Sequence, residues 1–219
     1  MTDVKQQLDA VTRAWRQEAH DGVTDNVQTL AQVYPATVPD LWDAVTSPER
    51  IPRWFLPVSG DLRTGGRYQL EGNAGGEILE CSPPADGRAH YRITWEFGGG
   101  ISWVTVRLTQ VEDGTRFELE HVAHSADIPA EMADMFGPGA TGVGWDGGLL
   151  GLSLHLSGTG GAIAPEDLAA WTASAAGQAF YRGAADAWGR AAVAAGVDEA
   201  TAQRQADATF GFYTGAQPS

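Results

Sequence analysis

The sequence contains a single cysteine, Cys81, in 219 residues. One cysteine excludes an internal disulfide, and a metal site built on cysteine pairs is not plausible. Basic residues are also scarce: 14 Lys and Arg, of which one is lysine, stand against 28 Asp and Glu, and the formal net charge is −14. Nucleic acids and anionic membranes attract positively charged surfaces. We therefore expect no nucleic-acid partner and no membrane partner.

Long apolar stretches are missing as well. The N-terminal segment has no apolar signal core, and no window approaches 18 apolar residues. Material for a buried core is nevertheless ample, because 43% of the residues are hydrophobic and eight are tryptophan. At 219 residues the chain is long for one domain and short for two. We expect a cytoplasmic protein of one domain with an appendage.

Motifs for metal or nucleophilic chemistry are absent from the sequence. The histidines share no ligand spacing on one element, and no HExxH, CxxC or GxSxG motif is present. The glycines at 98–100 and 158–161 do not join a strand to a helix in a phosphate-binding fingerprint. Loops are the plain explanation for them, and we expect no metal and no cofactor.

The spacing of apolar residues predicts the order of the elements. It predicts a helix over 3–20, a strand over 23–34, two short helices before 56, antiparallel strands from 67 to 121, a long helix over 143–156, and further helices over 165–195 and from 198 towards 210. The strands alternate between apolar and polar residues, which is typical of a sheet with one buried and one solvated face. Two short helices between the first two strands suggest a clamp over a cavity.

Several motifs occur in a fixed order along the chain. They are LWDAVTSPERIPRWFLP at 41–57, the pair Gly65-Gly66, GEILE at 76–80, YRITW at 91–95, Gly114-Thr115 followed by His121, and Gly144-Trp145 at the head of the long helix. In these motifs the chain resembles the family of homologues of the activator of the 90-kDa heat-shock protein ATPase, within the START-like (SRPBCC, birch-pollen-allergen-like) superfamily. The resemblance covers about Val27 to Leu156.

The resemblance implies an α+β helix-grip fold, a curved antiparallel sheet wrapped around a long helix, here with extra N- and C-terminal helices. We expect an N-terminal helix over 1–22, a START-like domain over 23–160, and a helical C-terminal extension over 161–219 packed on the domain. The superfamily binds hydrophobic small molecules between sheet and long helix, and some members are polyketide cyclases or aromatases. Co-chaperones of the family carry a second domain, for which this chain has no room.

Three polar side chains are candidates for acid–base chemistry. His121 is predicted to face inward, where a histidine is more often a satisfied core residue than a catalyst, although a polar anchor in an apolar pocket is the other reading. Glu77 enters the cavity only in one of two strand registers, and a slip of one residue reverses every side chain. Asp146 is the third candidate. A cyclase- or hydrolase-like enzyme requires at least two of them to converge in the cavity.

Aromatic residues provide the candidates for ligand contact. We expect the ligand-binding residues to be Trp54, Phe55, Tyr68, Tyr91, Trp95, His121, Trp145 and Leu149. Any single aromatic residue more often fills a solid core than lines a cavity. Among these residues, we expect Trp54 and Phe55 to lie at the cavity mouth. We therefore expect a START-like protein that binds a hydrophobic or aromatic small molecule. An enzyme using His121 with an acidic partner is the alternative, and a co-chaperone-type interaction protein is a weaker one.

The C-terminal extension has two interpretations. Its stripe of small and aromatic residues suits close helix packing, so it either covers the sheet or the N-terminal helix, or it forms a lid or a homodimer interface. The sequence leaves these alternatives open.

Overall fold

The protein is described by a computed structural model that covers residues 4–216. The helices are α1 (Val4–Ala10), α2 (Val38–Thr46), α3 (Ala130–Phe136), α4 (Gly139–Leu156), α5 (Pro165–Ala173), α6 (Ala175–Ala194) and α7 (Glu199–Thr214), with short 3-10 turns at Ile51–Arg53 and Ser125–Asp127. The strands are β1 (Thr12–His20), β2 (Val23–Tyr34), β3 (Val58–Gly60), β4 (Arg67–Leu70), β5 (Gly75–Ala85), β6 (Arg88–Phe97), β7 (Gly100–Val111) and β8 (Gly114–His124). Within the described range, no helix has the length and apolar character needed to cross a membrane.

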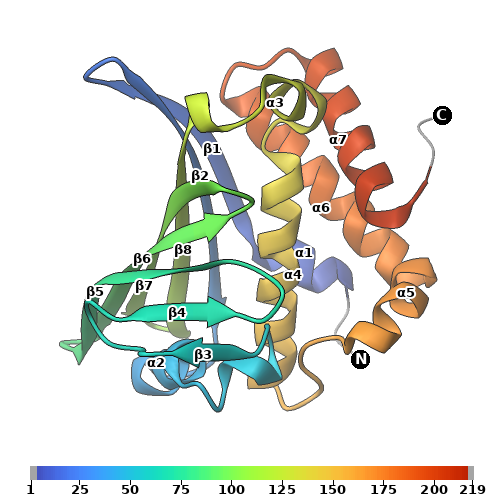
Figure 1. The fold of residues 1–219 in the computed structure, drawn as a ribbon. Coiled ribbons are helices and arrows are strands. Elements are labelled where there is room, and N and C mark those ends of the chain that lie inside the picture. Colours follow the sequence, from blue (N-terminus) through green and yellow to red (C-terminus); the bar gives the residue numbers. More distant parts are fainter. Residues whose placement is uncertain (1–3, 217–219) are drawn as a thin grey trace.

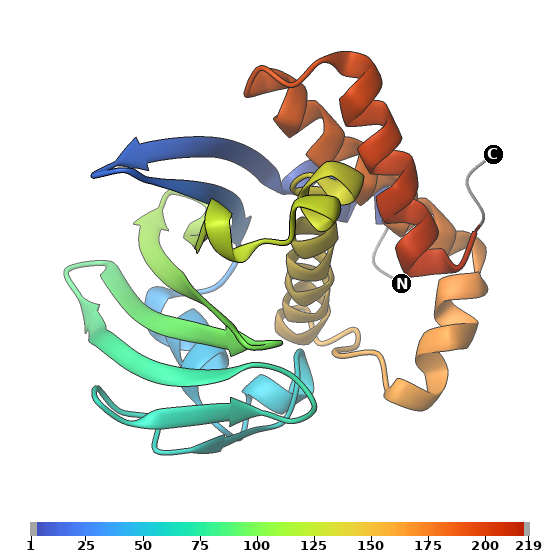
Figure 2. The ribbon, with the colours of Figure 1, turned by 45° about the horizontal axis from the view of Figure 1, so that its top comes forward.

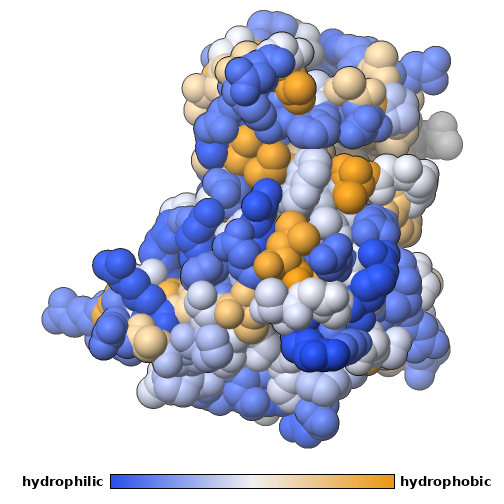
Figure 3. Space-filling view, turned by 60° about the vertical axis from the view of Figure 1, so that its left-hand side comes forward, coloured by the Kyte–Doolittle hydropathy of each residue, from blue (hydrophilic) through white to orange (hydrophobic). Residues whose placement is uncertain are grey.

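The eight strands form one antiparallel sheet in the order β1-β2-β8-β7-β6-β5-β4-β3. The sheet curves around α4, and the C-terminal helices cover the side of α4 that faces away from the sheet (Figures 1 and 2). This arrangement confirms the predicted α+β helix-grip fold. The face of the sheet turned away from α4 carries ion pairs such as Arg107 with Glu118 and Glu120. Most of the surface visible in Figure 3 is hydrophilic, with hydrophobic residues gathered in small patches at its waist.

The clamp between β2 and β3 forms for local reasons. Thr37 caps α2 by accepting a hydrogen bond from the amide of Asp40, and proline in the first turn suits the start of a helix. The helix buries Leu41 and Val45 against the sheet. The 3-10 turn that follows is held to α2 because the Trp54 indole donates to the Ala44 carbonyl at 2.8 Å. The clamp therefore closes one end of the sheet.

The predicted helix over 3–20 is only partly correct. Its first residue lies outside the described range, α1 ends at Ala10, and Thr12–His20 is an edge strand paired with β2 along its whole length. The hairpin turn consists of Asp21 and Gly22, both with positive φ (49° and 80°). Asp-Gly is a strong signal for a two-residue hairpin, and it outweighs the three-to-four spacing of apolar residues that favoured a helix.

The C-terminal extension contains three helices where the sequence predicted two. Ser174 ends α5 and caps α6, accepting from the amide of Gly177 at 3.1 Å, so the predicted single helix breaks there. Helix α6 packs on α4, α1 and β1, and α7 packs on α6. Gly142 of α4 lies against the fully buried ring of Trp188, which lets the two helices approach closely. The extension thus buries the outer side of α4 rather than the outer face of the sheet.

Candidate functional site

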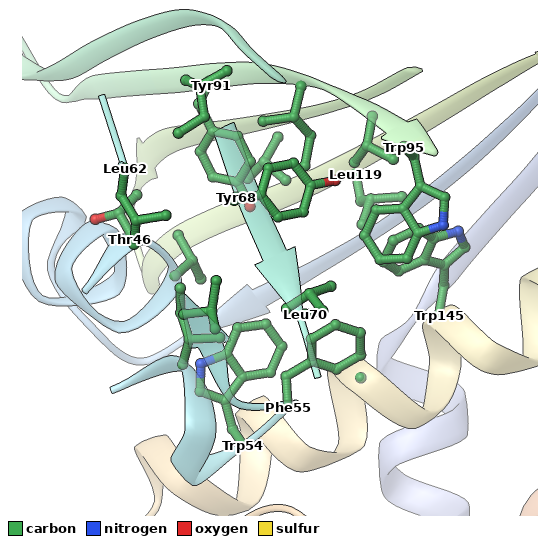
Figure 4. A pocket seen from close by; sticks show the side chains of 18 of the residues that line it. Thr46, Trp54, Phe55, Leu62, Tyr68, Leu70, Tyr91, Trp95, Leu119 and Trp145 are labelled. Carbon is green, nitrogen blue, oxygen red and sulfur yellow. The ribbon is translucent and has the colours of Figure 1, made fainter. Parts of the chain in front are cut away.

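An apolar cavity of about 140 Å³ lies between the sheet, the clamp and α4 (Figure 4). Its walls are Val45, Thr46, Ile51, Trp54, Phe55, Val58, Leu62, Tyr68, Leu70, Ile78, Cys81, Tyr91, Ile93, Trp95, Val104, Val106, Phe117, Leu119, Trp145, Gly148 and Leu149. The lining comes from the six strands β3 to β8, the clamp and one face of α4. Concave, mostly apolar pockets of this kind are the usual form of small-molecule sites.

A row of aromatic side chains closes one side of the cavity. Trp54 stacks on Phe55 with ring centroids 5.5 Å apart, Phe55 stacks on Trp145 at 6.5 Å, and Trp145 meets the edge of Trp95 at 4.8 Å. The same four residues also line an outer groove of about 480 Å³ between α4 and α5. The row therefore separates an inner cavity from an outer groove, and we refer to these four side chains as the aromatic wall.

Glycines on α4 make room for the wall. A side chain at Gly151 would overlap the backbone oxygen of Trp54, and one at Gly148 would touch the ring of Phe55 at 3.6 Å. At Gly147 an added Cβ would meet nothing within 4 Å. The clamp can thus approach α4 only because the facing positions carry no side chain.

The register of β5 differs from both predicted alternatives. A bulge between Ile78 and Glu80 shifts the pairing with β6, so Ile78 and Cys81 both line the cavity although they are three residues apart. Glu77 lies opposite Arg67 in the register of β4 with β5, is half-buried and does not line the cavity. The register in which Glu77 enters the cavity is therefore not the observed one.

His121 is buried and has a partner on each ring nitrogen. Its Nε2 lies 2.8 Å from the Ser102 hydroxyl, and its Nδ1 accepts the indole N–H of Trp145 at 3.2 Å. Burial lowers the pKa of His121 to about 4, so the ring is neutral near pH 7. The residue lines a separate cavity of about 210 Å³ and not the 140 Å³ cavity. His121 supports the wall by holding Trp145 and does not reach the inner cavity.

Asp146 points from α4 toward the C-terminal helices. Its carboxylate accepts from the Arg13 guanidinium, with the shortest bond at 2.7 Å, and from the Trp188 indole at 2.9 Å. Burial raises the pKa of Asp146, and the bonds from Arg13 and Trp188 oppose that shift. Asp146, Glu77 and His121 therefore lie in three different places. The convergence that acid–base catalysis in the cavity requires does not occur among them.

Seven of the eight ligand-binding candidates line the inner cavity, and His121 does not. Sequence reasoning missed the aliphatic part of the lining. The alternation of apolar and polar residues along the strands includes Val104, Val106 and Leu119, so this signal was available. Leu62 lies in a loop, and no periodicity places it. Within residues 4–216, no group of three or more His, Cys, Asp or Glu side chains is arranged to hold a metal ion.

Comparisons with known proteins agree with this architecture. The family model described as Activator of Hsp90 ATPase homolog 1-like protein matches residues 35–152. The solution structure of CalU16 from Micromonospora echinospora is 33% identical with a TM-score of 0.66, over 85% of this chain and 97% of that one. The crystal structure of CalU16 gives 31% identity and a TM-score of 0.62, over 86% and 99%. A protein from Mesorhizobium loti, 20% identical with a TM-score of 0.50 over 61% of this chain and 98% of its own, shares the fold. None of the curated proteins matches this chain.

Proposed function

This chain belongs to the Activator of Hsp90 ATPase homolog 1-like family, and we propose that it binds an aromatic small molecule in the cavity between its sheet and α4. The observation that carries the proposal is the cavity of about 140 Å³ with a lining of apolar and aromatic side chains. A preformed apolar cavity favours an apolar ligand because binding removes apolar surface from water without reorganising the protein.

The volume sets the size of the part that enters. An apolar cavity of about 150 Å³ admits one benzene molecule, so the inner cavity of about 140 Å³ accommodates a single aromatic ring. A longer ligand extends past the aromatic wall into the outer groove, where Trp54 and Trp145 are shared by both spaces. The ligand class is therefore a molecule with one terminal ring, with or without an extension.

The expected affinity for a simple ring is modest. Full burial contributes about 0.8 kcal/mol for each carbon group, which gives about 5–6 kcal/mol for toluene. This free energy corresponds to a Kd of about 0.1 mM. An acid–base enzyme is not supported, because His121, Glu77 and Asp146 do not meet in the cavity.

Calorimetric titration with toluene tests the proposal, with two leucine substitutions at neighbouring positions of α4. Gly148 lines the inner cavity, so Gly148→Leu fills part of it, whereas Gly147 lines only the outer groove and an added Cβ there meets nothing within 4 Å. We expect saturable binding to the unaltered protein and to Gly147→Leu, and its loss in Gly148→Leu. Absence of binding to the unaltered protein, or equal binding to both variants, would contradict the proposal.

A further inference from the structure

Tyr91 projects from the middle of β6 into the inner cavity. Its backbone pairs with Cys81 on one side and Val106 on the other, so the residue lies in the interior of the sheet. The ring of Trp42 contacts it edge-on at 6.1 Å and fixes its orientation. Figure 4 shows the Tyr91 ring beside that of Tyr68, both directed into the cavity.

Besides the thiol of Cys81, a weak hydrogen-bonding group that also lines the cavity, most polar side-chain atoms of the wall are paired with protein groups. The Trp54 indole donates to Ala44 at 2.8 Å, the Thr46 hydroxyl to Trp42 at 2.7 Å, the Tyr68 hydroxyl to Thr94 at 2.7 Å, and the Trp145 indole to His121 at 3.2 Å. The Trp95 indole nitrogen, which forms no such bond, lies toward Trp145 and away from the two tyrosines (Figure 4). Among the described residues, the Tyr91 hydroxyl has no hydrogen-bond partner.

We propose that the Tyr91 hydroxyl is the polar anchor of the inner cavity and that the ring it selects carries a phenolic hydroxyl. The inference rests on the proposed function, because it concerns the same cavity. The Tyr91 oxygen is open to the cavity, so an apolar ligand displaces water from it and supplies no hydrogen bond, whereas an oxygen on the ligand does. This gain is available only to a ligand with an acceptor at its inserted end.

Tyr68 makes a phenol preferable to a ketone. Its proton is committed to the Thr94 carbonyl, which leaves the Tyr68 oxygen free to accept. The two tyrosines are near enough to interact, since the pKa of Tyr68 is raised first by burial and then by Tyr91. Burial also raises the pKa of Tyr91, so both hydroxyls keep their protons at neutral pH. A phenolic hydroxyl can accept from Tyr91 and donate to Tyr68, whereas a ketone can only accept.

Phenol and toluene are isosteric and separate the polar contribution from the apolar one. Calorimetric titration of each ligand into the unaltered protein and into Tyr91→Phe gives, for each ligand, the ratio of its affinities for the two proteins. We expect Tyr91→Phe to weaken phenol binding about tenfold and to leave toluene binding unchanged. An equal change for both ligands, or no change for phenol, would overturn the inference.

Tyr34→Phe is the matched control. The Tyr34 hydroxyl donates to the Leu149 carbonyl at 3.3 Å and does not line the cavity. We expect Tyr34→Phe, which removes this hydrogen bond, to lower the melting temperature and to leave the ratio of phenol to toluene affinity unchanged. We expect Tyr91→Phe, which removes no hydrogen bond within the protein, to leave the melting temperature equal or higher. If neither ligand binds the unaltered protein, the proposed function fails. If toluene binds and Tyr91→Phe has no selective effect, this inference alone fails.

A second measurement does not depend on a variant. The NMR signal of the Tyr91 ζ-carbon reports directly on its hydroxyl. We expect this signal to shift on addition of phenol and to stay in place when toluene occupies the cavity. A shift of equal size with both ligands would contradict a hydrogen bond to the phenol.

Discussion

The rings of Phe55 and Trp145 lie stacked, 6.5 Å apart with 19° between their planes, and stand between the inner cavity and the outer groove. Phe55 belongs to the clamp and Trp145 to α4, so the wall joins the two parts of the fold that grip the sheet. In the proposed site, a ligand that reaches from the inner cavity into the outer groove has to pass between the members of this wall.

Phe55→Ala joins the cavity to the groove. We expect naphthalene to bind the variant at least tenfold more tightly than the unaltered protein, because the space for a second ring opens. The free energy of unfolding falls by about 1–3 kcal/mol, less than for a fully buried phenylalanine. Titration calorimetry measures the first effect and urea unfolding the second. Phe212→Ala, at an exposed phenylalanine of α7, is the control. Unchanged naphthalene affinity in a folded Phe55→Ala variant would contradict the role of the wall.

The low pKa of His121 predicts loss of stability in acid. The unfolded chain binds a proton near pH 6.5 and the folded protein only near pH 4. Stability from this residue is therefore full above pH 6.5 and decreases as the pH falls to 4, by about 3 kcal/mol. His121→Gln keeps hydrogen-bonding groups toward Trp145 and Ser102 but removes the titration. Urea unfolding between pH 4 and 7 should give a smaller slope for this variant, and His90→Gln on the surface should retain the original slope. Equal slopes for all three proteins would refute the assignment.

The ion pair of Arg13 with Asp146 joins β1 to α4 in a buried setting, with 6% and 1% of the two side chains exposed. Asp146→Asn leaves the Arg13 charge buried without its counter-charge, and we expect a loss of about 3–5 kcal/mol. The double variant Arg13→Met, Asp146→Leu should lose less stability than the single variant Asp146→Asn, because no unpaired charge remains. Asp61→Asn, which breaks an exposed pair with Arg63, should change stability by less than about 1 kcal/mol. The midpoints of urea unfolding measure these differences. A double variant less stable than Asp146→Asn would contradict the expectation.

The same substitution at two glycines of α4 is expected to have opposite effects. Gly147→Ala adds a methyl group in open space and improves helix propensity, so stability rises by about 0.5–1 kcal/mol. Gly142→Ala forces a methyl group into the ring of Trp188, so stability falls by several kcal/mol. Thermal unfolding of both variants measures the difference. Similar melting temperatures would show that α6 does not pack on α4 as described.

The alternation of strands β7 and β8 predicted a sheet with one buried face, because each of these strands buries one face only. Val104, Val106 and Leu119 follow this rule without exception. Strand β5 does not, since its bulge turns both Ile78 and Cys81 inward, and no local pattern announces a bulge. Strand β1 was missed for another reason: as an edge strand it buries few side chains, so the Asp-Gly turn was its clearest signal.

The chemistry of the candidate site was less predictable than its walls. The inward position of His121 follows from alternation, but its bond to Trp145 joins residues 24 apart and depends on how α4 is placed. Likewise, the free hydroxyl of Tyr91 emerges only after the partners of the surrounding side chains are known. Periodicity indicates which side chains face a core, whereas hydrogen-bond satisfaction is a property of the assembled fold.

Intermolecular nuclear Overhauser effects with bound toluene locate the ligand in the protein. We expect contacts from the toluene ring to the methyl groups of Ile78, Val106 and Leu119, which line the inner cavity, and none to Leu168 of α5 in the outer groove. Contacts confined to Leu168, or no saturable contacts in the folded protein, would contradict a ligand site between the sheet and α4.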